Sequence, residues 1–326
     1  MAILTIIIPS YNKGQYISEA LDSIFMQETT YSYEIIIADD CSQDNTLTIV
    51  KKYQNKFPNK IKLLTSESNQ KLYRNVLRAY AITKSDYFCV LDPDDYWIDK
   101  KKIQKSLDFL EANKDYTIYV TNTLQKLPDG TIKPFTKNKS KSSDFQDYLK
   151  GKAVLGCTLG SMYRNVVFKN GLPSKMINLD NPTCEATFRG DSFRNILHIA
   201  KGKAYSVKDY DAVYRITKEG LWQGSTKLYQ HLLNANAWIN FYKYYDEKYP
   251  ELILIANSLF HKSITKNLHE LTQKELPMLI AVSQALNENK DIIHKHKLKN
   301  LKFSYWILYK LYTYLHDKLK RKGLIE

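Results

Sequence analysis

Five short apolar runs in the first half of the chain, separated by amphipathic stretches, constrain the fold more than any other feature of the sequence. Each run is rich in β-branched residues and predicts a strand of about four to seven residues. The runs are almost wholly apolar and do not alternate with polar residues, as expected for a parallel sheet covered on both faces. In chain order they are LTIIIPS, YEIIIADD, IKLLTSES, YFCVLDPDD and YTIYVTN.

The stretches between these runs carry apolar residues at helical spacing. Three of them predict helices, over 17–25, 47–53 and 103–110. Strands that alternate with helices predict right-handed crossovers and a mostly parallel, doubly wound α/β sheet. In such a sheet ligands bind beyond the carboxyl ends of the strands, and three polar segments fall there: PSYN, ADDCSQDNT and LDPDDYW.

The pattern changes after about residue 125. Asp129 and Gly130 are a strong turn signal and predict a hairpin. Two later strands are expected in GCTLGSMYRN and KAYSVKDYDAVYRIT, with a helix around GDSFRNILHIA between them. Three helical patterns follow, in HLLNANAWINFYKYY, LILIANSLFHKSITKNLHEL and SYWILYKLYTYLHDKLKRK. We therefore expect an α/β domain over 1–220 and a helical C-terminal region over 221–326.

One apolar run ends in three carboxylates, at Asp92, Asp94 and Asp95 of CVLDPDDYW. One interpretation is a simple turn, because proline sets the bend and aspartate caps neighbouring amides. The other is a cation site, because two unit charges about 4 Å apart repel by about 4 kcal/mol at an effective dielectric constant of about 20. A divalent cation would remove this repulsion. Oxygen ligands suit Mg²⁺ or Mn²⁺, which also bind substrate phosphates.

A second acidic pair, Asp39 and Asp40, ends another apolar run. Ser42 and Asp44, a few residues further on, are expected to cap the helix that starts near Thr46. A carboxylate at the strand end itself is better placed to accept hydrogen bonds from a base or a ribose.

Three segments, in order, resemble glycosyltransferase family 2, whose members have the GT-A fold: TIIIPSYNKGQYISEALDSIFMQ, EIIIADDCSQDNT and RNVLRAYAITKSDYFCVLDPDDYW. The family pattern is an opening PxYN, a DD(G/C)SxD segment and an LDxDD segment at matching distances. The resemblance is dense over 1–115 and thinner to about 225. It implies a Rossmann-like GT-A domain with a nucleotide-sugar half over about 1–115 and an acceptor half over about 116–220. It also implies an enzyme, an inverting glycosyltransferase that uses a nucleotide diphosphate sugar.

The resemblance assigns roles by position in the nucleotide-sugar half. Pro9, Tyr11 and Asp40 would hold the nucleoside. Asn69 and Arg74 would line the base and the diphosphate, although Arg74 also fits an ordinary solvated position on a helix. UDP is the donor nucleotide that the family uses most often, so a UDP-sugar donor is expected by analogy.

The same resemblance makes Asp92 and Asp94 the DxD pair that binds the nucleotide sugar and Mn²⁺ or Mg²⁺. Asp94 would be the direct metal ligand, and Asp92 would face the ribose or a metal-bound water. Asp95 and Trp97, directly after the pair, are candidates for contacts with the acceptor or the diphosphate.

An inverting transfer needs a base that takes the proton of the acceptor hydroxyl, and a carboxylate within about 3 Å can do this. The family places it in an acidic pair before a helix, and FRGDSFRN occupies that place, with Gly190 where an acidic residue is common. Asp191 is therefore the candidate base. The alternative is that Asp191 only caps the helix beginning at Ser192. Asp180, in the loop before that helix, is the second choice.

Further along, VYRITKEGLWQGS resembles the family stretch YRxHxxGxWSG, in which the histidine often helps to hold the metal. This chain has Thr217 at that position. Threonine is a poor ligand for a divalent metal, so water or pyrophosphate oxygens would complete the coordination. Arg215, Lys218 and Trp222 are candidates for closing over the diphosphate or the acceptor, with a structural role as the alternative.

A net charge of +14 favours an anionic partner. A nucleic acid is not expected, because no nucleic-acid-binding motif is present and the basic residues are scattered. The four cysteines form no CxxC pair and indicate free thiols in a reducing cytoplasm. The start MAILTIIIPSYNK lacks the basic region of a secretory signal, and no segment is long and apolar enough to span a membrane. We expect a cytoplasmic protein, with contact at the inner face of the cell membrane left open.

The segment 290–326 contains ten Lys and Arg residues against three Asp and Glu residues, with apolar side chains at helical spacing. One interpretation is a helix packed on its own bundle or on another subunit. The other is an interfacial helix whose basic face contacts anionic lipid while Trp306 lies at the boundary. The QxxRW motif and membrane helices of processive synthases are absent, which favours addition of single sugars to a cell-surface glycan or lipid-linked acceptor.

Two alternatives share parts of this pattern. A sugar nucleotidyltransferase also combines an α/β sheet with paired aspartates, but it has a glycine-rich phosphate loop near the N terminus, whereas PSYNKGQ holds one glycine. A catalytically silent sugar-nucleotide-binding protein is compatible with the replacement at Thr217.

Overall fold

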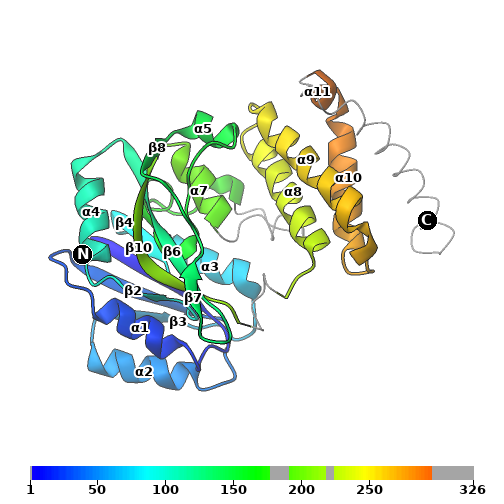
Figure 1. Ribbon diagram of the computed structural model, residues 1–326. Coiled ribbons are helices and arrows are strands. Elements are labelled where there is room, and N and C mark those ends of the chain that lie inside the picture. Colours follow the sequence, from blue (N-terminus) through cyan, green and yellow to red (C-terminus); the bar gives the residue numbers. More distant parts are fainter. Residues whose placement is uncertain (1, 177–190, 218–223, 296–326) are drawn as a thin grey trace. The chain divides into compact units, whose positions relative to one another are not determined.

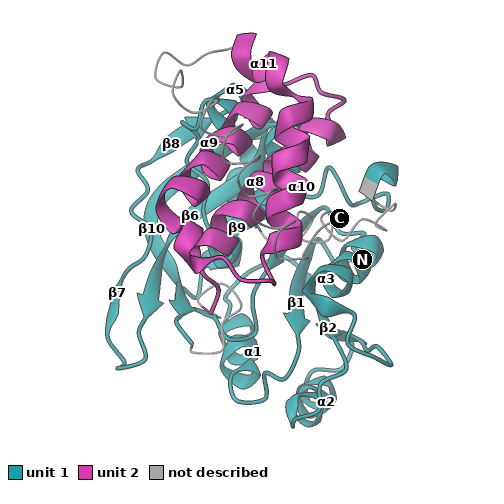
Figure 2. Cartoon of the chain, turned by 90° about the vertical axis from the view of Figure 1, so that its right-hand side faces the viewer, with its two compact units in different colours: residues 1–179, 188–223 teal, residues 180–187, 224–326 magenta. Residues whose placement is uncertain are grey.

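The computed structural model describes residues 2–176, 191–217 and 224–295. The chain divides into two compact units, coloured separately in Figure 2. Unit 1 comprises residues 1–179 and 188–223, and unit 2 comprises residues 180–187 and 224–326. Each unit has its own helices and core, and the two are described in turn.

The centre of unit 1 is a sheet in the order β3-β2-β1-β4-β9-β6-β10-β5 (Figure 1). Its first four strands run parallel, with β1 between β2 and β4. Every residue of β1 is buried, because alternate side chains face helices on opposite sides of the sheet. This explains why the first runs are apolar throughout. The four strands are β1 (Leu4–Ser10), β2 (Tyr33–Asp39), β3 (Ile61–Leu64) and β4 (Tyr87–Val90).

The other half of the sheet is mixed. Strand β9 is antiparallel to both β4 and β6, whereas β10 is parallel to β6. Short strands complete it: β5 pairs with β10 as an edge, β7 forms a hairpin with β6, and β8 pairs with β10. These strands are β5 (Tyr96–Trp97), β6 (Tyr116–Lys126), β7 (Ile132–Pro134), β8 (Lys141–Ser143), β9 (Ser161–Arg164) and β10 (Lys203–Arg215).

Helices cover both faces of the parallel strands. Ile6 and Ile8 of β1 belong to a core cluster with apolar residues of α1 and α4, while α3 contacts β1 and β2. The helices and 3₁₀ turns of unit 1 are α1 (Ile17–Phe25), α2 (Thr46–Lys56), α3 (Lys71–Ile82), α4 (Lys102–Ala112), α5 (Phe145–Leu149), α7 (Asp191–Ile199), η1 (Thr158–Gly160) and η2 (Ser174–Met176).

The α/β fold with a mostly parallel half sheet is as the sequence predicts. The predicted hairpin is also present: Gly130 has φ +86°, and β7 pairs with β6 across the turn. The prediction did not include β5 and β8. Strand β8 has the polar sequence KSS, and β5 has only two residues, so neither carries the apolar run that indicates a strand.

Unit 2 is helical, as predicted. Helices α8 and α9 pack along each other, and α10 contacts both. Thr226 caps α8 by accepting a hydrogen bond from the amide of Tyr229, and Pro250 occupies the first position of α9. The elements are α8 (Lys227–Tyr244), α9 (Pro250–Asn267), η3 (Leu268–Glu270), α10 (Leu276–Glu288) and α11 (Lys290–Lys295).

Among the described helices, none has the length and apolar character needed to cross a bilayer. The predicted basic helix that includes Trp306 lies outside the described residues, so its two interpretations stay open.

Candidate active site

The polar segments that follow β1, β2 and β4 lie at one edge of the sheet, because these strands are parallel and in register. Ser10 at the end of β1 pairs with Asp39 at the end of β2. The amide of Asp40 then donates to the carbonyl of Ser10 at 2.9 Å. The strand order therefore brings the three motifs together at the edge where α/β sheets bind ligands.

The segment Asp92–Asp95, called the acidic tip below, follows β4. The amide of Asp95 donates to the carbonyl of Asp92 at 3.0 Å, so the segment is a turn as well as a cluster of carboxylates. Burial, followed by the neighbouring charge of Asp94, raises the pKa of Asp92 to about 6. The charge of Asp191 also contributes to this rise, which indicates that Asp191 lies close to the tip.

Asp94 and Asp95 have different partners. Asp94 Oδ2 lies 2.6 Å from Lys13 Nζ. Asp95 is 1% exposed, and its Oδ1 accepts a hydrogen bond from the amide of Arg215 at 2.8 Å. Its Oδ2 is buried and has no hydrogen-bond partner in the described part of the chain. Burial, with the charges of Asp92 and Asp94, raises the pKa of Asp95 well above its usual value.

The loop that carries Lys13 is held by the segment between β2 and α2. The amide of Lys13 donates to Thr46 Oγ1 at 2.8 Å, and the amide of Gly14 donates to Asp44 Oδ2 at 2.9 Å. A Cβ atom on Gly14 would lie 1.7 Å from the side-chain oxygen of Asn45, so a larger residue here would force the Asn45 side chain to move. Burial opposes the charge of Asp44, but hydrogen bonds from Thr46 and Gly14 outweigh it and lower its pKa.

Arg215, at the end of β10, connects the acidic tip to α1. Its Nε donates to the carbonyl of Asp94 at 2.9 Å, and its Nη2 pairs with Glu19. Its guanidinium carbon lies 5.1 Å from the centroid of the Tyr16 ring and 5.3 Å from that of Tyr96. Arg215 therefore fixes the tip from the side of β10.

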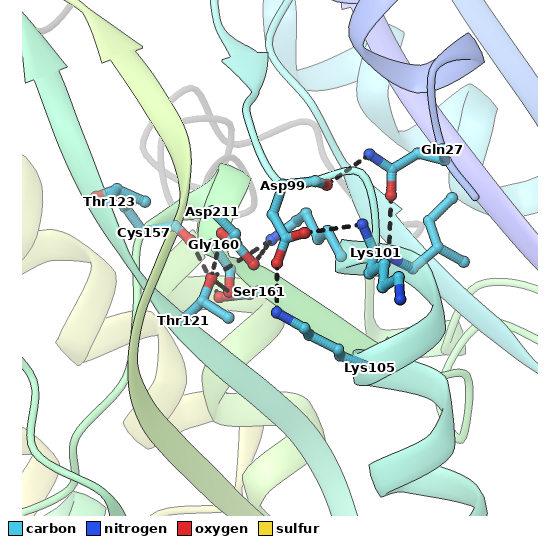
Figure 3. Close-up of polar contacts among 12 residues, drawn as sticks. Gln27, Asp99, Lys101, Lys105, Thr121, Thr123, Cys157, Gly160, Ser161 and Asp211 are labelled. Carbon is cyan, nitrogen blue, oxygen red and sulfur yellow. Dashed lines mark hydrogen bonds and ion pairs between the residues drawn. The ribbon is translucent and has the colours of Figure 1, made fainter. Parts of the chain in front are cut away.

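A buried ion pair holds β10 in place below the tip. Lys102 Nζ lies 2.8 Å from Asp211 Oδ2, and both side chains are almost fully buried. The other carboxylate oxygen of Asp211 accepts a hydrogen bond from Thr121 Oγ1 at 2.6 Å. Figure 3 shows Asp211 and Thr121 beside Gly160, together with Asp99 and its contacts to Gln27 and Lys105. The amide of Ile98 donates to the Asp211 carbonyl, which connects this network to β5.

Trp97, which lies in β5, is 2% exposed and belongs to the hydrophobic core cluster. Lys102 Nζ lies 5.6 Å from the centroid of its ring.

The residues predicted to hold the nucleoside lie at the edge formed by β1 and β2. Pro9 is buried and Tyr11 is 43% exposed. Asp40 is buried, and its Oδ1 accepts hydrogen bonds from the amide of Gln70 at 2.7 Å and from Ser66 at 3.1 Å. Asp40 therefore positions the segment that precedes α3.

The two residues predicted to line the base and the diphosphate are on that segment and on α3. Asn69 Oδ1 accepts a hydrogen bond from the amide of Lys71 at 2.9 Å. Arg74 is exposed on α3.

The candidate base Asp191 is the first residue of α7 and is partly buried. One turn further on, Arg194 is 2% exposed and donates to Tyr80 at 2.9 Å and to Thr158 at 2.8 Å. Arg194 thereby attaches the first turn of α7 to α3 and to η1. Three other candidates, Asp180, Lys218 and Trp222, lie outside the described residues, as does Gly190 directly before Asp191.

The carboxylate oxygens of the acidic tip are suitable ligands for a hard divalent cation. Such a cation would be held by only a few protein groups. Within the described ranges, no group of three or more His, Cys, Asp or Glu side chains converges as a metal site. Mg²⁺, however, is usually held by one or two carboxylates together with substrate phosphates and water. Asp94 already binds a cationic group, the ammonium of Lys13, and Asp95 Oδ2 has no hydrogen-bond partner among the described residues. Thr217 is partly buried after β10.

Three basic residues near the site were not predicted from the sequence. Lys13 contacts Asp94, Arg194 anchors α7, and Lys126 is paired with Arg215 across β6 and β10. Two of them carried a signal, because Lys13 directly follows the PSYN motif and Arg194 lies in the FRGDSFRN segment. Lys126 is brought to the site by strand pairing.

Comparisons with known proteins identify the family and the fold. The family model described as "Glycosyl transferase family 2" matches residues 5–172. The poly(ribitol-phosphate) β-N-acetylglucosaminyltransferase TarS of Staphylococcus aureus is 34% identical over 115 residues, 35% of this chain and 20% of TarS. The dTDP-rhamnosyl transferase RfbG of Shigella flexneri is 32% identical over 153 residues, 46% of this chain and 51% of RfbG.

An uncharacterized protein of Mycobacterium tuberculosis is 24% identical over 229 residues, 68% of this chain and 61% of that protein. The chain thus spans less than two thirds of the length of these relatives.

Solved structures show the same fold. The crystal structure of S. aureus TarS 1–349 in complex with UDP-GlcNAc has a TM-score of 0.60 at 18% identity and covers 87% of this chain and 81% of that one. The mannosyltransferase PcManGT of Pyrobaculum calidifontis, in complex with GDP-Man and Mn²⁺, has a TM-score of 0.50 at 13% identity and covers 91% of this chain and 88% of that one.

Proposed function

The chain belongs to glycosyl transferase family 2, and we propose that it moves a sugar from a UDP-sugar to a hydroxyl group of a cell-surface glycan or a lipid-linked acceptor. That it is a glycosyltransferase follows from the family match and from the names of its relatives. The proposed transfer from a UDP-sugar to an acceptor hydroxyl rests mainly on the acidic tip. This segment lies beside the end of β1, at the ligand-binding edge of the sheet.

The donor proposal rests on the residues at the edge of β1 and β2. Tyr11, which is 43% exposed, follows β1, and the buried Asp40 follows the neighbouring β2, so an aromatic ring and a carboxylate that suit a base and its ribose come from adjacent strand ends. Asn69 and Arg74 follow on the neighbouring segment. TarS was solved with UDP and with UDP-GlcNAc, which supports UDP as the nucleotide.

Asp94 and Asp92 would hold Mn²⁺ or Mg²⁺, together with oxygens of the diphosphate. A divalent cation in that position neutralises charge that develops on the leaving diphosphate. Lys13 and Arg215 add positive charge at the tip, because they contact the side chain and the carbonyl of Asp94.

Asp191 would act as the general base of a single displacement. The acceptor oxygen forms a bond to the anomeric carbon while the bond from that carbon to the diphosphate breaks. UDP leaves with the electron pair of the broken bond, and the Asp191 carboxylate takes the proton of the hydroxyl. Attack opposite the leaving group inverts the configuration. Arg194 supports this role, because it attaches the first turn of α7 to Tyr80 and Thr158.

A thermal-shift screen of nucleotide sugars with and without Mn²⁺ tests the proposal, because selective ligand binding stabilises the folded state. We expect a UDP-sugar with Mn²⁺ to give the largest shift, and the D94N variant to lose most of the dependence on Mn²⁺. Product analysis by mass spectrometry should then show the sugar on an acceptor hydroxyl. The proposal fails if no UDP-sugar binds, or if the D94N variant responds to Mn²⁺ as the wild type does.

A further inference from the structure

Strand pairing places two basic side chains next to each other where β6 and β10 end. Arg215 is the register partner of Lys126 in the parallel ladder of these strands. Paired residues project from the same face of a sheet, so both cations lie on one face. Lys133 pairs across the hairpin with Gln125, the residue directly before Lys126 in β6. Because successive residues of a strand point to opposite faces, Lys133 projects from the face opposite to Lys126.

Basic groups and tyrosine rings alternate along this face, from the acidic tip to the hairpin. Lys13 Nζ and the Arg215 guanidinium lie 5.9 Å and 5.1 Å from the centroid of the Tyr16 ring. Arg215 and Lys126 lie 5.3 Å and 5.9 Å from the centroid of the Tyr96 ring. The row therefore contains three cations separated by two aromatic rings.

The cations in this row differ in whether a carboxylate neutralises them. Lys13 pairs with Asp94, and Arg215 pairs with Glu19. No carboxylate of the described segments forms an ion pair with Lys126. An uncompensated ammonium beside a guanidinium attracts an anionic group, and it is partly buried here, where screening by water is weaker.

A cavity of about 400 Å³ opens beside these cations. Its lining includes Gln15, Tyr16, Lys126, Gly130, Arg215 and Thr217. The volume is in the range of small-molecule sites, with aromatic surface for the C–H face of a sugar and polar groups for its hydroxyls. None of the residues proposed to bind the nucleoside or the metal lines this cavity, although Arg215 contacts the acidic tip directly.

We propose that this cavity is an acceptor subsite in which Lys126 and Arg215 bind a phosphate or carboxylate group of an anionic glycan. The inference rests on the proposed sugar transfer and names the chemical class of its acceptor. Because Arg215 both lines the cavity and contacts Asp94, an acceptor bound here lies beside the place where the donor diphosphate is proposed to bind.

Charge reversal at Lys126 tests the subsite, with Lys133 as the matched control. Both lysines are on the same hairpin, but Lys133 is exposed on the other face and does not line the cavity. The probes are an oligo(ribitol phosphate), an oligogalacturonate and the neutral maltohexaose, and binding is measured by calorimetry at low and high NaCl. Thermal unfolding of each variant checks that it is folded.

We expect the wild type to bind at least one anionic oligomer, with an affinity that falls as salt rises, and to bind maltohexaose far more weakly. Phosphate and carboxylate sources are distinguished by which of the two oligomers binds. The K126E variant should lose about tenfold or more in affinity, which is about 1.4 kcal/mol, whereas K133E should stay within about twofold. The K126R variant should retain binding.

Four results with the soluble ligands would overturn the inference. The first is that neither anionic oligomer binds, and the second is that maltohexaose binds as tightly as the anionic oligomers. The third is that K126E and K133E lose the same affinity for the anionic oligomer. The fourth is that K126E, but not K133E, loses UDP binding, which would assign the cavity to the donor. If the wild type binds phosphatidylglycerol vesicles and K126E, but not K133E, abolishes this binding, the cavity would be assigned to a lipid surface. This result would also overturn the inference. A wild type that binds the oligomers but not UDP with Mn²⁺ would instead contradict the proposed function.

Discussion

The three carboxylates of the acidic tip differ in their surroundings, and this difference supports separate roles. The Asp94 carboxylate contacts the ammonium group at the end of the long Lys13 side chain, so a metal cation can replace that partner. Asp95 is buried and accepts from a main-chain amide, which suits a residue that fixes the turn. Asp92 precedes both of them in the chain, and burial, followed by the charge of Asp94 and with a contribution from Asp191, raises its pKa.

Replacing Asp191 with Asn should reduce turnover by about a thousandfold, a loss typical for a general base, and leave the affinity for UDP with Mn²⁺ nearly unchanged. The amide keeps the size and the start of α7 but cannot accept the proton. Single-turnover kinetics and calorimetry measure the two effects separately. Asp209, which is exposed on β10, provides the control variant D209N. Full activity in D191N would reject the assignment.

The stability of the D92N variant should depend on pH in a defined direction. Burial raises the pKa of Asp92 to about 6, so the folded protein binds this proton more tightly than the unfolded chain does. The contribution of Asp92 to stability is therefore fully present below about pH 4 and is lost as the pH rises to about 6. As the pH rises from about 4 to about 6 in the absence of metal, the free energy of unfolding of D92N should increase by about 2 kcal/mol relative to that of the wild type.

Denaturant titrations of wild type and D92N from pH 4 to 7, in the presence of a chelator, measure this difference. The exposed D209N variant should show no such trend. A stability difference between D92N and wild type that is constant over this range would contradict the assigned environment of Asp92.

The acidic residues of the candidate site carry a clearer sequence signal than its basic residues. Asp40, Asp92 and Asp94 follow apolar runs, and the ends of parallel strands meet at one edge. Lys126 lies outside the motifs, and Arg194 lies in FRGDSFRN but was given no role there. Their contacts depend on the register of β6 with β10 and on the packing of α7, which no local pattern specifies.

At the scale of elements, the buried pair of Lys102 and Asp211 connects α4 to β10. The K102M variant should lose about 3–5 kcal/mol of stability, because it leaves a buried carboxylate without a counterion. The double variant K102M/D211L should lose less than K102M alone. Denaturant unfolding measures both.

The surface pair of Lys203 and Asp115 is the control for this prediction. It has the same distance of 2.8 Å, but its side chains are about half exposed. The K203M variant should therefore change stability by less than about 1 kcal/mol. Equal losses in K102M and K203M would contradict the structural role given to the buried pair.

Helices and strands that are buried against one another could be predicted from the sequence, because burial requires apolar residues in a regular pattern. Strands β1 and β2 are covered on both faces and therefore consist of apolar runs, and α1 and α4 present periodic apolar faces to them. Strand β5 could not be predicted, because its two residues pair with β10 more than 100 residues later in the chain. Its position depends on the tertiary structure alone.

At the scale of the molecule, all residues proposed to bind the donor belong to unit 1. UDP with Mn²⁺ should therefore slow hydrogen exchange in the segments after β1, β2, β4 and β10, because binding suppresses local opening. Exchange in α9 of unit 2 should not change, which provides an internal control. Mass spectrometry of peptides measures both. Protection confined to α9 would contradict the location of the donor site.

The C-terminal segment remains a separate proposal at this scale. Cosedimentation with anionic vesicles, compared between the full chain and a chain ended near residue 298, tests membrane contact. Size determination of the same two chains by light scattering tests self-association. A loss on truncation in one assay alone would assign the basic segment to that role.

The most direct test of the account is anomalous diffraction at the manganese edge from crystals soaked with MnCl₂ and UDP. We predict one peak at the acidic tip, bonded to Asp94 at about 2.1 Å and to diphosphate oxygens, with Lys13 moved away from Asp94. UDP bound with no manganese at the tip, and Lys13 still paired with Asp94, would contradict it.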